Sequence, residues 1–101
     1  MSDIELQDSL TECRIRLVLF EDEIFITQMK ISKMLEWLII SEKYVSRIND
    51  TSAYRVISTA IEDGNSVVGN LREIQRENMS ERDNVSRELM EIELKLKNGL
   101  L

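Results

Sequence analysis

The feature that most constrains this chain is a heptad pattern of apolar residues, unbroken by proline anywhere and by glycine before residue 64. Alternate steps of three and four residues place a stripe along one side of an α-helix, which is the seam of a coiled coil. In the first half, ten of the twelve seam positions are apolar: Leu10, Cys13, Leu17, Phe20, Ile24, Thr27, Ile31, Met34, Leu38, Ser41, Val45 and Ile48. This pattern predicts one helix over residues 3–48.

A second seam has the same spacing but a different phase. Its positions are Tyr54, Ile57, Ile61, Gly64, Val68, Leu71, Gln75, Asn78, Arg82, Val85, Leu89, Ile92 and Leu96. The first seam, continued past Ile48, would place core positions at 52 and 55 instead. The intervening residues 49–52 read Asn-Asp-Thr-Ser, a sequence that favours a helix end followed by a new N-cap. We therefore predict a turn at 49–52 and a second helix over 53–98, with Gly99 as its C-cap.

These elements predict an all-α fold: an antiparallel two-helix hairpin of coiled-coil type, forming a single domain over 1–101 that assembles into a helical bundle. With the turn centred near Thr51, residue i faces residue 102 − i, so that seam positions such as Leu10 and Ile92 meet. The turn-like stretch from Glu62 to Ser66 offers an alternative with three helices. The heptad phase continues through Gly64, which favours a single second helix, and Trp37 is expected to fill the space above that glycine.

The first helix is also apolar on the side away from its seam. A two-helix hairpin buries one stripe of each helix, and a large exposed apolar patch usually marks an interface. The predicted interface residues are Ile15, Val18, Leu19, Phe25, Ile26, Met29, Ile39 and Ile40. The second helix shows a milder widening at Ala53, Ala60, Val67 and Ile74. The expected partner is a second copy, in a dimer or tetramer such as a four-helix bundle, or another helical protein.

Besides Ser41, four polar residues interrupt the seams, at Thr27, Gln75, Asn78 and Arg82. Thr27 is expected opposite Gln75, and Arg82 opposite Phe20, where Glu21 or Glu23 would accept from its guanidinium. Two interpretations stay open. Buried polar layers can fix register and partner at a cost in stability, or the helices can separate locally and let water in.

Composition excludes several classes of function. The chain has no histidine and one cysteine, so the commonest general base and metal ligand are missing and no internal disulfide can form. Its net charge of −6 opposes nucleic-acid binding. We find no catalytic constellation, phosphate loop or metal cluster, and no apolar run near the ~20 residues of a membrane span. We expect a non-enzymatic protein of the reducing cytoplasm, without cofactor, metal, small-molecule substrate or membrane span.

Residues 69–85, GNLREIQRENMSERDNV, resemble a SNARE motif, with Gln75 at the position of the central polar layer, Leu71 and Val68 below it and Met79 above. The resemblance implies a parallel four-helix bundle in membrane fusion. Asn78 and Arg82 depart from that motif as further polar core positions, and no membrane anchor follows.

We therefore predict a non-catalytic coiled-coil assembly or scaffold subunit that acts through helix–helix interaction. The alternatives are a SNARE-like or tethering component of membrane traffic, and a small helical regulator or secretion chaperone that binds a partner's amphipathic helix.

Overall fold

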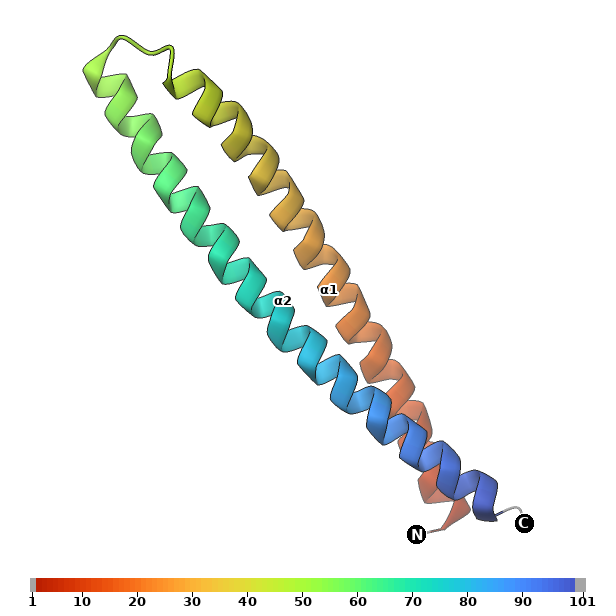
Figure 1. Cartoon of the computed structure of the whole chain (residues 1–101). Helices are drawn as coiled ribbons and strands as arrows, with labels where there is room; N and C mark the ends of the chain where they lie inside the picture. Colours follow the sequence, from red (N-terminus) through yellow and green to blue (C-terminus); the bar gives the residue numbers. More distant parts are fainter. Residues whose placement is uncertain (1, 100–101) are drawn as a thin grey trace. The chain divides into compact units, whose positions relative to one another are not determined.

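The computed structural model describes residues 2–99 and consists of two long α-helices joined by a short linker (Figure 1). Helix α1 spans Asp3–Val45 and α2 spans Thr51–Gly99. The two helices pack against each other as an all-α hairpin, and the described residues contain no strand. The predicted fold class is therefore confirmed.

The linker differs slightly from the predicted turn. Helix α1 ends three residues early, because the amides of Arg47 and Ile48 bond to carbonyls only three residues back, at 3.0 and 3.3 Å, which tightens the chain out of the α-helix. Among the candidate caps, Asp50 is the one used: its Oδ1 accepts from the amides of Ser52 and Ala53 at 2.8 and 3.1 Å. Helix α2 therefore begins at Thr51, two residues before the prediction.

Helix α2 runs without interruption through Gly64, so the three-helix alternative is wrong. No residue in the described range has a positive φ, which means that Gly64 serves as a helical residue and not as a turn. Gly99 is likewise the last residue of α2 and lacks the left-handed conformation expected of a C-cap.

The chain divides into two compact units, each containing part of both helices. The first unit comprises residues 1–25 and 76–101, and the second comprises residues 26–75. The single-domain organisation stays a prediction.

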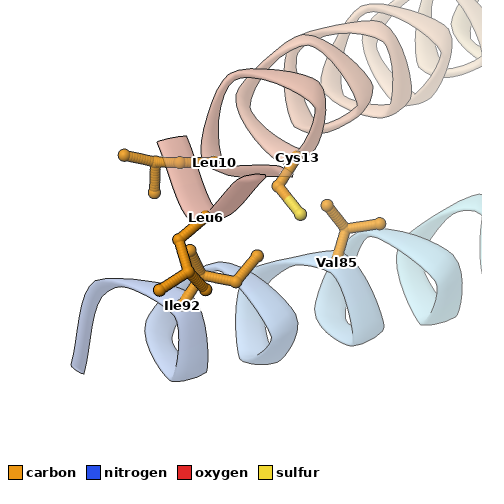
Figure 2. Close-up of a cluster of buried hydrophobic side chains, with 5 residues drawn as sticks. All are labelled: Leu6, Leu10, Cys13, Val85 and Ile92. Carbon is orange, nitrogen blue, oxygen red and sulfur yellow. The ribbon is translucent and has the colours of Figure 1, made fainter. Parts of the chain in front are cut away.

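In the first unit, the core forms where the two seams meet (Figure 2). Leu6, Leu10 and Cys13 of α1 are buried with Val85 and Ile92 of α2. Half-buried side chains complete the cluster: Leu17, Phe20, Leu89 and Leu96. Leu6 lies four residues before the first predicted seam position, so the seam continues one step further toward the N-terminus than predicted.

In the second unit, Ile31 and Leu38 of α1 are buried with Val68 of α2. Half-buried apolar side chains surround them: Met34, Leu35, Ile61 and Leu71. The closest approach is at Gly64, where a Cβ would lie 3.0 Å from Leu38 Cδ2 and 3.1 Å from Trp37 Cζ3. Gly64 thus faces Leu38, as the antiparallel register predicts, and Trp37 covers the glycine as expected.

Burial follows the two predicted seams closely. Every position from Leu10 to Ile48 in the first seam is buried or half-buried, including the polar residues Thr27 and Ser41. In the second seam only Tyr54 is exposed. Helix α1 has already ended at Val45, so no α-helical turn of α1 lies opposite Tyr54.

Candidate interaction surface

The first unit carries an apolar patch on the side of α1 away from its core. Ile15, Val18, Leu19 and Phe25 each expose between 57 and 66% of their surface. The first three of these residues, with Thr11 and Arg14, line a shallow hollow of about 370 Å³. The seam of α1 faces α2, and these residues lie between the seam positions, which leaves them in water.

The second unit carries a corresponding patch on α1, formed by Ile26, Met29, Ile39 and Ile40. Ile39 and Ile40 are as exposed as the residues of the first patch, whereas Ile26 is the least exposed of the eight, at 39%. All eight residues of the predicted interface are therefore exposed, and their role in binding stays a prediction.

A second apolar surface, which shares Ile40 with the predicted interface, is a groove along one flank of the second unit. Trp37 is 42% exposed and lines two hollows, of about 390 and 280 Å³. The first hollow is also lined by Lys30, Lys33, Met34, Val67 and Leu71, and the second by Ile40, Ser41, Tyr44, Val56, Ile57 and Ala60.

The sequence contains rows of apolar residues at seven-residue spacing that contribute to this groove. In α2, Ala53, Ala60, Val67 and Ile74 form one apolar row, and the same row continues as Glu81 and Glu88. Trp37 and Tyr44 share the equivalent spacing in α1. The α2 row was predicted to flank the seam, but not to form a surface together with these two aromatic residues.

In the first unit, the flanks of the helix pair carry charged side chains. Arg16 contacts Glu88 at 3.4 Å, and Arg14 lies 3.8 Å from Glu93. All four side chains are well exposed, so each pair contributes at most about 1 kcal/mol. These pairs therefore favour the antiparallel arrangement of this unit without dominating its stability.

Two of the predicted polar layers lie in the second unit. Thr27 is buried, with 4% of its surface exposed, and Gln75 is half-buried. Gln75 Nε2 donates to Gln28 Oε1 at 2.9 Å. Gln75 thus lies close to the register expected opposite Thr27, since its Nε2 reaches the next residue along α1.

The other two layers, Asn78 and Arg82, are half-buried residues of the first unit. Arg82 donates from Nε and Nη2 to Asp83 Oδ1, both at 3.3 Å. The predicted acceptors, Glu21 and Glu23, are wrong for this guanidinium, since a carboxylate one residue away on the same helix is easier to reach than the opposite helix. The register-setting role of the four layers stays a prediction.

The chemistry available on these surfaces is limited. Cys13 is buried, and burial together with the charges of Glu88 and Glu12 raises the pKa of its thiol against the opposing effect of Arg16. A thiol held in its neutral form is a poor nucleophile. Within residues 2–99, no group of three or more metal-ligating side chains occurs, and neither helix has an apolar stretch suited to crossing a membrane.

Comparison of this chain with protein-family models, with curated proteins and with solved structures finds no match. The geometry of the two apolar surfaces is therefore the basis for assigning a function.

Proposed function

We propose that this protein is a non-catalytic coiled-coil assembly subunit that binds other helices through the outer face of α1 between residues 15 and 40. The observation that carries the proposal is the exposure of eight large apolar side chains on that face. Fully burying a side chain of this size is worth about 1.5–3 kcal/mol. A helix that leaves so many of them in water gains stability when a partner covers them.

Helix–helix packing is the form of recognition that fits such a face. An exposed stripe on a long, regular α-helix offers ridges and grooves to another helix, and it offers no enclosed cavity for a small molecule. In this proposal the partner is a second copy or another helical protein, and the polar layers at Thr27, Gln75, Asn78 and Arg82 set the register. The single buried cysteine fits a reducing compartment such as the cytoplasm.

The groove beside Trp37 and Tyr44 favours a second candidate function, in which the protein binds a partner's amphipathic helix as a small regulator or chaperone. Aromatic residues of this kind are frequent anchors in protein interfaces. A SNARE-like function is less well supported, because it needs residues 54–96 free to align with foreign helices. In both units this stretch packs against α1.

The test of the proposed function is the substitution Ile26→Glu. We expect helicity by circular dichroism to be retained and the oligomer to dissociate in light scattering, because the new carboxylate would be buried in the interface. The matched control is Ser66→Glu, which places the same charge at an exposed position of α2 and should assemble like the wild type. If Ile26→Glu assembles normally, the interface assignment is wrong.

A further inference from the structure

The outer face of α1 has a heptad seam of its own. Its positions again alternate by three and four residues, and all are exposed: Glu12, Ile15, Leu19, Asp22, Ile26, Met29, Lys33, Glu36, Ile40 and Lys43. The charges along it are unequally distributed. Its first half carries Glu12 and Asp22, whereas its second half carries Lys33 and Lys43, with Glu36 as the exception. A seam that is acidic at one end and basic at the other is complementary in charge to a second copy of itself in antiparallel orientation.

We infer that the partner of this face is a second copy of the chain, packed α1 against α1 in antiparallel orientation, with residue i facing residue 55 − i of the other copy. This inference rests on the proposed function and names its partner and register. In this register Glu12 meets Lys43 and Asp22 meets Lys33. The apolar positions pair as Ile15 with Ile40 and Ile26 with Met29, and the twofold axis repeats each pair. One pair is mismatched, Leu19 with Glu36.

Neighbouring registers are much less favourable. A shift by one heptad in one direction places Asp22 opposite Ile40 and Ile26 opposite Glu36. A shift in the other direction places Glu12 opposite Glu36 and Asp22 opposite Ile26. Like charges and charges against apolar side chains both disfavour helix pairing. A parallel arrangement would bring each charged residue to its own counterpart, so that all five positions would repel.

The charges of this seam are available to a partner. Arg14 and Arg16 pair with glutamates of α2, but in the described part of the chain no ion pair involves Glu12, Asp22, Lys33 or Lys43. The apolar residues Val18, Phe25 and Ile39 flank the seam and are exposed as well. They would extend the buried area of the same dimer.

The test is a pair of charge-reversed chains. One chain carries Glu12→Lys and Asp22→Lys, and the other carries Lys33→Glu and Lys43→Glu. Alone, each chain would face four like-charge pairs in its own dimer. We expect its self-association, measured by sedimentation equilibrium, to weaken by about 10- to 1,000-fold, because four attractive ion pairs become like-charge pairs. Mixed in equal amounts, the two chains should form a one-to-one heterodimer at wild-type affinity.

The matched control is the variant with Glu21→Lys and Glu42→Lys. It changes the net charge by the same amount as the first chain, at exposed positions of α1 outside this seam, and should self-associate like the wild type. The register is overturned if the reversed chains each dimerise like the wild type, or if the mixture fails to restore the dimer. In either case the proposed function is retained if the wild-type chain assembles and the Ile26→Glu variant does not. A well-folded wild-type chain that remains monomeric overturns both.

Discussion

At the scale of single residues, the two glycines inside α2 have opposite environments. A Cβ at Gly69 would have no neighbour within 4 Å, whereas a Cβ at Gly64 would lie 3.0 Å from Leu38 and 3.1 Å from Trp37. Alanine is about 1 kcal/mol more favourable than glycine within a helix. We therefore expect Gly69→Ala to raise the free energy of unfolding by about 0.5–1 kcal/mol in urea titrations.

For Gly64→Ala, the same gain in helix propensity is offset because the new methyl group displaces Leu38 and Trp37. The free energy of unfolding should therefore rise by less than in Gly69→Ala, or decrease. The Trp37 fluorescence spectrum should shift in this variant and remain unchanged in Gly69→Ala. An equal gain in stability from both substitutions would show that Gly64 is not closely packed.

Cys13 makes stability depend on pH in a defined direction. Its pKa is raised in the folded chain by burial and by Glu88 and Glu12, so the unfolded thiol ionises first as pH increases. The contribution of Cys13 is complete below the ordinary thiol pKa of about 8.5 and is lost as pH rises through the higher folded value. Between pH 7 and 10, the wild type should therefore lose more free energy of unfolding than Cys13→Ala. An identical loss in both chains would exclude this contribution.

At the scale of the helices, Gln75 is the first of three successive polar positions in the α2 seam, and it donates a hydrogen bond to Gln28, whose side chain is exposed. We expect Gln75→Leu to raise the free energy of unfolding by about 0.5–1 kcal/mol, because leucine buries more apolar surface and water can replace the partner of Gln28. It should also broaden the distribution of oligomers in sedimentation velocity. Asn70→Leu, at an exposed α2 position, is the control with little effect on stability. A large loss from Gln75→Leu would instead show that its polar contacts support the fold.

Spacing alone predicted the helices and the side of each that is buried, because every seam position except Tyr54 is buried or half-buried, even where a polar residue such as Thr27 or Ser41 occupies it. Details that depend on local competition were not predictable. Three adjacent residues could have capped α2, and hydrogen-bond geometry selected Asp50. Arg82 was expected to reach Glu21 or Glu23 on α1, and it pairs instead with Asp83 on its own helix. The groove at Trp37 is lined by flanking rows of both helices, whereas the heptad pattern defines the seam of each helix separately.

At the scale of the whole molecule, the balance between buried and exposed apolar surface decides how the chain behaves in solution. One face of α1 contributes to the cores of both units, and the opposite face exposes residues of similar size. Small helical hairpins have little core for their length and depend on further packing for stability. Folding and association should therefore be coupled in this protein.

Coupling of this kind makes stability depend on protein concentration, since only the folded form associates. We expect light scattering to give twice the mass of the chain, and the urea midpoint followed by circular dichroism to rise across a hundredfold concentration series. The Ile26→Glu variant should have a lower midpoint that does not vary with concentration. A poorly helical wild-type monomer would mean that the outer face of α1 is covered by a different helical protein. A stable helical monomer with a constant midpoint would mean that the hairpin tolerates this face in water, and the assembly function would then be wrong.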